Sequence, residues 1–247
     1  MAATRQRVDH ADTRMMGIVH DALRRDLRRT REALSRQPYP RGSQKAAIAG
    51  HVEWMMRYLQ QHHEGEDHDL WPLLRRKAPG AAPLLDTMET DHAGIAEAMA
   101  MVTAAAANYA GGEPDEPRLA LLAALDELDE VLLPHLEREE QEAMPVAEAA
   151  MTAAEWQAWS QQFIRHKSFA ELGEEGHWLL DGLDDFRYQV VVRQVPPVPR
   201  FILVHGFARR YRRHAAARWD TPGMSPGDGN SGTPASGTFS EMKSARR

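Results

Sequence analysis

Two acidic blocks of the chain contain the residue types and the spacing of a metal site. Residues 62–72 and residues 135–145 share the pattern H-x-E-x-E-[DE]-x-[DE]-x-x-P and lie 73 residues apart. Within each block a histidine is followed four residues later by a glutamate. On a helix, residues four positions apart lie on the same face, about one turn from each other. Each block therefore places an imidazole and a carboxylate where both can reach one cation.

A lone histidine precedes each block at nearly the same distance. His20 lies 42 residues before the first block, and His92 lies 43 residues before the second. A single buried histidine is usually a satisfied core residue, and an acidic block is usually a solvated helix end. A two-fold repeat of both features at matched spacing instead favours a site for two metal ions. Its six expected ligands are His20, His62, Glu66, His92, His135 and Glu139.

The expected ligands lie in four stretches whose apolar residues recur at helical spacing. These stretches run over about residues 16–27, 48–66, 85–102 and 121–139. Segments rich in proline and glycine, at residues 37–42, 78–80 and 111–115, separate them. Short connections favour antiparallel neighbours, so we expect an all-α fold built on an up-down-up-down four-helix bundle. Unpaired imidazoles and carboxylates in its core would be unfavourable, and shared binding of a cation removes that penalty.

The composition narrows the chemistry and the cellular setting. The chain has 247 residues and no cysteine, so thiolate metal sites, disulfides and cysteine nucleophiles are excluded. A formal net charge of -6 gives no reason to expect nucleic-acid binding. The first residues lack the apolar core of a signal peptide, and no apolar run approaches the roughly 18 residues of a spanning helix. These features predict a cytoplasmic protein.

The residues after the four stretches predict a helical extension and a tail. Thr152 and Glu155 match a capping box, which predicts a fifth helix to about His166. The helical signal weakens over residues 167–195 and returns as a basic amphipathic helix over 200–219. The remainder is rich in Gly, Ser, Pro and Thr and is expected to be disordered. The expected domains are a metal-binding bundle at 10–150, the extension at 151–219 and the tail at 220–247.

The basic helix expected at residues 200–219 allows three interpretations. Its apolar face could pack on the chain's own bundle, which is the simplest of the three. It could lie on an anionic membrane surface, as basic amphipathic helices do. It could also bind a partner protein or a nucleic acid. The sequence alone does not choose among them.

The sequence resembles the hemerythrin-like (HHE cation-binding) proteins over about residues 10–150. Their pattern has a histidine on helix one, HxxxE on helix two, HxxxH on helix three and HxxxxD on helix four. His20 matches the first position. His62 and Glu66 match the second, His92 the start of the third, and His135 the start of the fourth. The match is closest to a bacterial variant with one histidine on helix three and HxxxE on helix four.

The family pattern fails at two positions of this chain. Ala96 stands where the second histidine of helix three would be. The position five residues after His135, an aspartate in the family, is Glu140, beside Glu139 at the position four after. With four imidazoles, the site would be more open than a site with five. The residues that we consider for filling the gap are Tyr58, Glu97 and Glu140.

The remaining histidines near these blocks are expected to have other roles. We expect His63, His68 and His177 at the surface or beside the ligands. His51 shares the helix face of His62, but eleven residues separate the two, about 16 Å along a helix. That distance is too long for the two imidazoles to share one ion.

The resemblance implies a non-haem centre of two iron ions bridged by carboxylates. Imidazole and carboxylate ligands do not by themselves select iron over other transition metals, so iron is an expectation from the family alone. The first expected function is binding of O2 or a related molecule, NO or peroxide, for storage, transport or sensing. The alternative is a di-iron enzyme that decomposes peroxide or reduces NO. A third class is a structural or regulatory protein, in which the site supplies iron or cross-links the bundle.

Overall fold

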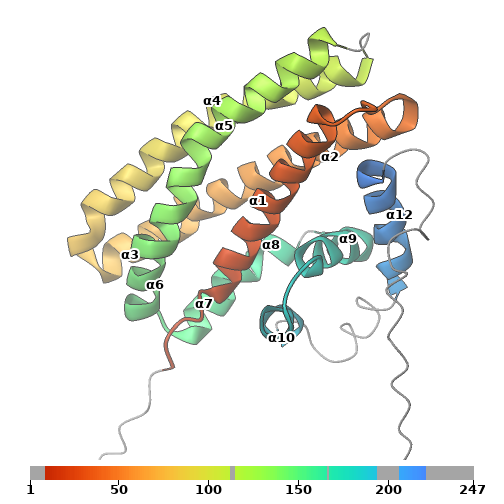
Figure 1. The fold of residues 1–247 in the computed structure, drawn as a ribbon. Helices are drawn as coiled ribbons and strands as arrows, with labels where there is room; N and C mark the ends of the chain where they lie inside the picture. The colour runs from red at the N-terminus through yellow and green to blue at the C-terminus, as the bar shows by residue number, and fades with distance from the viewer. Residues whose placement is uncertain (1–8, 112–114, 166, 194–205, 221–247) are drawn as a thin grey trace, which may run out of the picture.

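The computed structural model describes residues 9–111, 115–165, 167–193 and 206–220. These residues form helices and no β-strand, with one isolated β-bridge between His10 and Thr152. Four long rods contain the two acidic blocks and the two lone histidines (Figure 1). The first rod is α1 (Arg14–Ser35), and the second is α2 (Gly42–Gly65) continued by η1 (Glu66–Leu70) and α3 (Trp71–Lys77). The third is α4 (Ala82–Gly111), which follows the short η2 (Pro79–Ala81). The fourth is α5 (Glu116–Arg138) continued by η3 (Glu139–Ala143) and α6 (Met144–Ala150).

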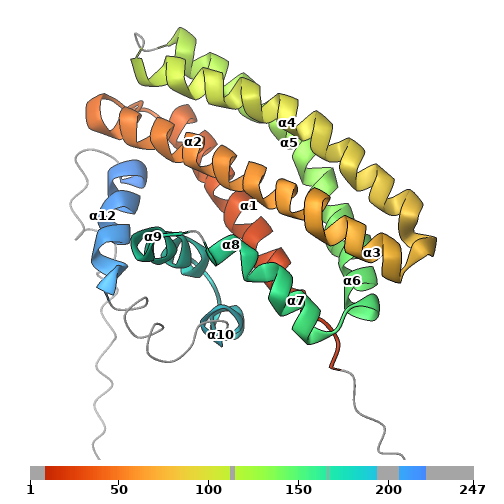
Figure 2. The ribbon, with the colours of Figure 1, turned by 180° about the vertical axis from the view of Figure 1, so that it is seen from behind.

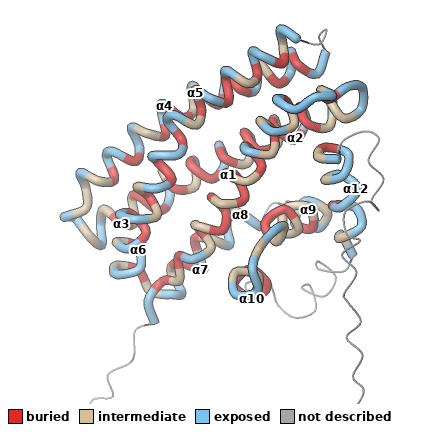
Figure 3. The backbone as a smooth tube through the Cα atoms, viewed as in Figure 1, coloured by how far each residue is buried: buried red, intermediate tan, exposed pale blue. Residues whose placement is uncertain are grey.

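The four rods pack around a shared interior. α4 runs beside both α2 and α5, and α1 contacts α2 and α5, as the two opposite views show (Figures 1 and 2). Buried residues lie on the sides of the rods that face each other, and exposed residues lie on the outside (Figure 3). The all-helical fold expected from the sequence is therefore confirmed for the described residues.

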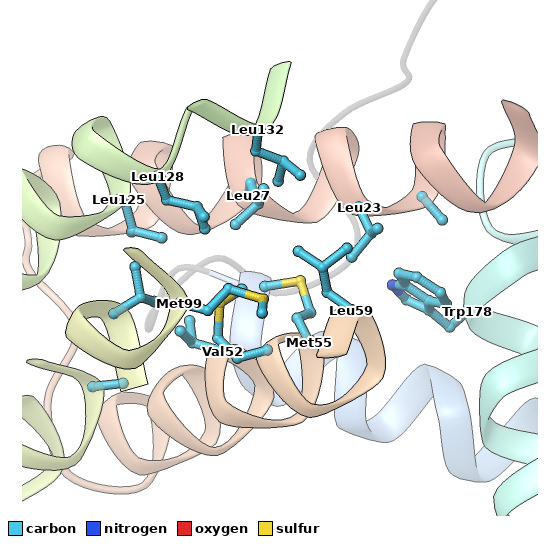
Figure 4. Close-up of a cluster of buried hydrophobic side chains, with 14 of the residues drawn as sticks. Leu23, Leu27, Val52, Met55, Leu59, Met99, Leu125, Leu128, Leu132 and Trp178 are labelled. Atoms are coloured by element: carbon cyan, nitrogen blue, oxygen red, sulfur yellow. The ribbon is translucent and has the colours of Figure 1, made fainter. Parts of the chain in front are cut away.

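The apolar stripes of the sequence form the core between the rods. Figure 4 shows this cluster, which contains Leu23, Leu27, Val52, Met55, Leu59, Met99, Leu125, Leu128 and Leu132. Each of these side chains is buried. Full burial of a side chain of this size contributes about 1.5–3 kcal/mol to folding. Trp178, from the extension, reaches the same cluster, so the core includes part of the extension (Figure 4).

The second and fourth rods are each interrupted by one π-helical turn at the same place in the repeat. These turns, η1 and η3, begin at Glu66 and Glu139, the glutamates of the two acidic blocks. In each turn the glutamate carbonyl accepts a hydrogen bond from the amide five residues later. The next residue, Pro72 or Pro145, has no backbone N–H and therefore cannot donate the next hydrogen bond of the helix. Single π turns are common at functional sites because they widen a helix locally, and the sequence analysis, which expected regular helices, missed them.

The extension is more helical than the sequence predicted. The capping box of Thr152 and Glu155 is confirmed, but the helix that it begins ends at Ser160, and a short helix follows. A second capping box, formed by Ser168 and Glu171, begins a helix in the segment where the sequence signal is weak. The helices after the bundle in the described part of the chain are α7 (Ala153–Ser160), α8 (Gln162–Arg165), α9 (Phe169–Leu180), α10 (Asp185–Arg193) and α12 (Ala208–Trp219).

The basic amphipathic helix corresponds to α12, which packs on the chain's own bundle. It contacts α2 and α9, with Tyr211 and Arg218 buried (Figure 2). Of the three interpretations, packing on the bundle is the one confirmed for residues 208–219. The expected start of this helix at residue 200 and nearly all of the expected tail, residues 221–247, lie outside the described residues.

None of the helices in the described part of the chain has the length and apolar character needed to cross a membrane. The cytoplasmic location stays a prediction of the sequence.

Candidate metal centre

Two groups of buried ligand atoms lie side by side between the rods. In each group, three atoms of the type that binds metals lie within 4.8 Å of one another. The first group joins α1, α2 and η3, and the second joins α2, α4 and α5. All six residues are buried. The first group is His20, His62 and Glu139, and the second is His63, His92 and His135.

Two glutamates connect the groups: Glu139, which belongs to the first group, and Glu66, which belongs to neither. The two carboxylate oxygens of Glu66 are 3.1 Å from Nε2 of His62 and 3.6 Å from Nε2 of His92. Oε2 of Glu139 is 3.3 Å from Nε2 of His20 and 3.7 Å from Nε2 of His135. Each carboxylate therefore contacts one imidazole of each group, which is the position of a group that bridges two ions.

Carboxylates outside the two groups lie beside three of the imidazoles and orient two of them by hydrogen bonds. In each case the Nδ1 atom lies next to a carboxylate oxygen, while Nε2 faces the centre. A carboxylate can only accept, so Nδ1 carries a proton and Nε2 is the nitrogen that a metal would bind. Such outer partners are typical of histidine ligands to metals. The hydrogen-bonded pairs are His20 with Glu140 at 2.8 Å and His92 with Asp67 at 2.7 Å, whereas Nδ1 of His135 lies 3.5 Å from Asp91 without a hydrogen bond.

Most of the ligand atoms at this place have no hydrogen-bond partner among the described residues. A buried polar atom without a partner costs about 1–3 kcal/mol, and a charged atom costs more. One or two such atoms occur in many folds, but here nine converge on one place. A pair of cations would satisfy the carboxylate oxygens and one nitrogen of each imidazole, so the residues present fit a two-metal centre. The nine atoms are both ring nitrogens of His63 and of His135, both oxygens of Glu66 and of Glu139, and Nε2 of His92.

Burial keeps several of these imidazoles in the neutral form that binds metals. It lowers the pKa of His62 to about 3 and that of His135 to about 4. Burial also lowers the pKa of His63 well below its ordinary value, and the neighbouring imidazoles add to this effect. Burial alone would raise the pKa of Glu139, but the charge of His20 outweighs it and lowers that pKa to about 2. Glu139 is therefore ionised.

The pKa values of two other groups predict that metal binding strengthens as the pH rises. Burial lowers the pKa of His20, but the Glu139 carboxylate outweighs it and raises that pKa to about 9. Burial, with the nearby Glu139 charge, raises the pKa of Glu66 well above its ordinary value. Without a cation, His20 is therefore protonated at pH 7, and a metal must displace its proton.

We expect protons to be released when metal-free protein takes up metal at pH 7, and the apparent affinity to rise between pH 6 and pH 9. A pH-indicator dye in weakly buffered solution measures the release. Uptake without proton release, with an affinity that does not change with pH, would contradict this electrostatic account.

His63 is the member of the two groups that the sequence analysis missed. We expected it at the surface or beside the ligands, but it is 3% exposed and its ring stacks on that of His92, with the centroids 4.1 Å apart. α2 is contacted by α1 on one side and by α4 on the other, so adjacent residues on it face two different parts of the interior. His63 precedes Glu66 by three residues, and this i, i+3 spacing was the available signal.

The sequence analysis expected one imidazole to be missing at Ala96. In the structure, His63 places a third imidazole beside His92 and His135. None of the three proposed replacements has an atom in the two groups. Tyr58 packs against Trp54 and Trp178. Glu97 is exposed, and Glu140 accepts hydrogen bonds from His20 and Arg24.

The other histidines lie where the sequence analysis placed them, outside the ligand set. His68 is exposed, and its ring bonds the carbonyl of Glu64. His177 is half-buried and stacks on Tyr211 in the extension. His51 is buried away from the two groups, with Nε2 at 2.7 Å from a carboxylate oxygen of Asp26.

A helical bundle that gathers five imidazoles and two carboxylates at one buried place defines a cation-binding protein. A family model of the hemerythrin HHE cation binding domain matches residues 12–155. The chain therefore belongs to the hemerythrin HHE family, as the resemblance predicted. No curated protein and no solved structure shows a significant match to the chain.

Proposed function

We propose that this chain binds two iron ions and, through them, O2 or a related small molecule such as NO or peroxide. In this proposal His20 and His62 bind one ion, and Glu66 and Glu139 bridge the two. The second ion is bound by the group of His63, His92 and His135. The observation that supports this assignment most strongly is the convergence of nine buried, unpartnered ligand atoms. The choice of iron rests on the family, because these ligand types also suit other transition metals.

The proposed centre lies in a four-helix bundle of the up-down-up-down type, with domain limits near residues 10 and 150. It corresponds to the variant with HxxxE on the second and fourth rods, in which the histidine at position 63 takes the place of a second histidine on the third rod. The paired iron supplies reversible redox and ligand-binding chemistry. The protein holds the ions, orients the imidazoles through outer carboxylates and excludes bulk water by burial.

The two proposed ions differ in their number of imidazole ligands and in the space beside them. We use this difference to propose which ion binds the external molecule. One group contributes two imidazoles and the other contributes three. A cavity of about 390 Å³ lies beside His62, between α1, α2 and the helices of the extension. The ion with fewer protein ligands therefore has space next to it for an external molecule. The cavity is lined mainly by apolar and aromatic side chains, among them Met15, Val19, Tyr58, Trp159, Phe163 and Leu179.

The walls of this cavity favour neutral molecules over ions. Burial raises the pKa of Tyr58 well above its ordinary value, so its phenol stays protonated and uncharged at neutral pH. Lys167 and Glu175, both half-buried in the wall, form an ion pair in which the two charges offset each other. Neutral O2 and NO pass into such surroundings more easily than hydrated anions, because a charge loses its hydration there.

The alternative is a di-iron enzyme that decomposes peroxide or reduces NO, and the size of the cavity is the observation that favours it. A water molecule occupies about 30 Å³ in the liquid. A cavity of about 390 Å³ therefore has far more room than a diatomic molecule needs. Peroxide, or two molecules of NO, would fit within this space.

Optical spectra of the iron-loaded protein under air and under argon, followed by assays of peroxide and NO turnover, test the two functions. A reversible spectral change with O2 and negligible turnover would support binding. Rapid turnover would support the enzyme. Iron-loaded protein that shows neither a spectral response nor turnover would contradict both and leave a structural or regulatory role.

The contact between the extension and α2 yields a prediction about access to the centre. The ring of Phe163 lies directly on Gly65, so that a Cβ added at Gly65 would lie 2.4 Å from the ring. The indole N–H of Trp159 donates to the Gly65 carbonyl at 3.2 Å. We expect Gly65→Ala to displace Phe163, to open the cavity beside His62, and to lower stability by about 1–3 kcal/mol, as overpacking does.

Stopped-flow binding of azide to the iron-loaded protein measures this change, and the variant should bind and release azide faster than the native protein. Gly50→Ala is the matched control, because it lies on the same helix with open space around its Cβ. Equal azide kinetics in all three proteins would show that the extension does not control access.

A further inference from the structure

A second cavity, on the side of α2 that faces the C-terminal helix, has the composition of a binding site. It has a volume of about 350 Å³ and lies between α2, α9 and α12. We call it the Arg218 cavity, after the arginine in its wall. Its lining includes the rings of Trp54, Trp178 and Tyr211 and the charged side chains of Arg218 and Glu174. None of the proposed metal ligands lines it.

Arg218 is buried in this wall, with its guanidinium over the rings of Tyr211 and Trp219 at 5.9 and 5.7 Å and with no carboxylate bonded to it among the described residues. The residue is 8% exposed, and its Nε and Nη2 atoms are buried and make no hydrogen bond within the described part of the chain. Its backbone is held in place, because Gln44 donates a hydrogen bond to the Arg218 carbonyl. Burial lowers the pKa of Arg218. A guanidinium without hydrogen-bond partners is destabilising in an interior, and an anion with two oxygens would satisfy it.

The acidic groups near Arg218 already have other partners. Glu174 is the only acid in the lining of the cavity as described, and it lies 2.8 Å from Nδ1 of His214 and 3.5 Å from Nε of Arg210. Asp26, deeper in the bundle, accepts hydrogen bonds from His51, Arg25 and Trp178. None of these carboxylates hydrogen-bonds the guanidinium of Arg218, so two of its nitrogens are left for a ligand from outside the chain.

The walls around Arg218 are flat and aromatic. Trp54 and Trp178 meet edge to face, with their centroids 5.0 Å apart. The ring of His51 stacks parallel to Trp54 at 5.4 Å. Tyr211 closes another side, and its hydroxyl donates to Asp181 at 3.0 Å. A flat apolar body would pack against these rings, and aromatic pairs of this kind add stabilisation beyond the buried area.

We propose that the Arg218 cavity binds a small aromatic carboxylate, with its carboxylate on the guanidinium of Arg218 and its ring against Trp54, Trp178 and Tyr211. This site is separate from the metal centre, and the proposal does not depend on the function proposed for that centre. The helical extension then has a role of its own, because α9 and α12 build two of the three walls.

Titration with benzoate tests the proposal, and benzamide, which has the same ring without the charge, is the comparison. Binding is followed by the fluorescence of the tryptophans and by the melting temperature of the full chain. We expect benzoate to change the fluorescence and to raise the melting temperature, and benzamide to bind at least roughly tenfold more weakly, since it lacks the charged hydrogen bonds.

Arg218→Met and Arg213→Met are the paired variants. Arg213 is exposed on the same helix and does not line the cavity. We expect Arg218→Met to lose the response to benzoate and to melt no lower than the native protein, because a buried guanidinium with two unsatisfied nitrogens has been removed. Arg213→Met should respond like the native protein.

Three results would overturn the proposal. The first is no response of the native protein to benzoate. The second is equal binding of benzoate by Arg218→Met, measured on the folded variant. The third is binding of inorganic phosphate as tight as that of benzoate, which would remove the aromatic body from the assignment.

Discussion

Iron-loaded His63→Ala should contain fewer than two iron ions per chain, because the second ion loses one of its three imidazoles and a cavity opens beside the other two. Both ring nitrogens of His63 are buried without a hydrogen-bond partner, and its ring stacks on that of His92. Loss of the ring removes a ligand and also leaves a cavity beside the remaining ones. Metal content by elemental analysis and the melting temperature should therefore fall together.

His68→Ala is the matched control, because it removes an imidazole from the same acidic block. Its ring is exposed and bonds only the Glu64 carbonyl among the described residues. We expect this variant to keep its iron and its melting temperature. A His63→Ala protein with full iron content would show that the five imidazoles are not the ligand set. Equal iron loss in both variants would show that iron binding depends on the acidic block as a whole and not on the imidazole of His63 in particular.

Removal of the metal from the native protein should lower the melting temperature by roughly 10–20 °C, which for a chain of this size corresponds to about 5 kcal/mol. Nine buried polar atoms of the centre have no hydrogen-bond partner among the described residues, and each unsatisfied atom costs about 1–3 kcal/mol. Protonation and entry of water recover part of this penalty, so the net loss is smaller than the sum. Binding of the metal is thus linked to the stability of the bundle.

Differential scanning calorimetry of the iron-loaded protein, the chelated protein and the chelated protein after reloading measures this effect. Reloading should restore the original transition, which separates loss of metal from damage by the chelator. A chelated protein that melts as high as the iron-loaded protein would contradict the assignment of these residues as buried ligands.

The two-fold repeat made much of the centre predictable. Helical spacing placed each histidine and glutamate on the face that continues an apolar stripe, and the structure brings all six expected residues to one place. The reason is physical: a stripe defines the inward face of a helix, so a polar residue in the stripe must lie in the interior. The family assignment rested on the same residues.

His63 could not be found from that stripe, because the face that it occupies is buried only by a second neighbouring helix. α2 contacts both α1 and α4, and which neighbours a helix has depends on tertiary packing. The π turns at Glu66 and Glu139 were missed for a related reason. The prolines that follow are visible in the sequence, but a proline alone does not show whether the preceding turn widens, bends or ends.

The extension was predicted least well, since its helices depend on contacts with the bundle. Val190, Val191 and Val192 have little intrinsic preference for a helix, yet they are buried in α10. Trp178 lies in the main core, where its indole N–H donates to Asp26 at 3.0 Å. Tertiary contacts of this kind override local preference, and no spacing rule reveals them.

The central claim, a centre of two iron ions in this bundle, is tested most directly by the metal content of protein purified after growth with sufficient iron, measured with its optical spectrum. The account predicts close to two iron ions per chain and an absorption that changes with oxidation state. One zinc ion per chain with no iron, or a protein that folds with full stability and no metal, would contradict it.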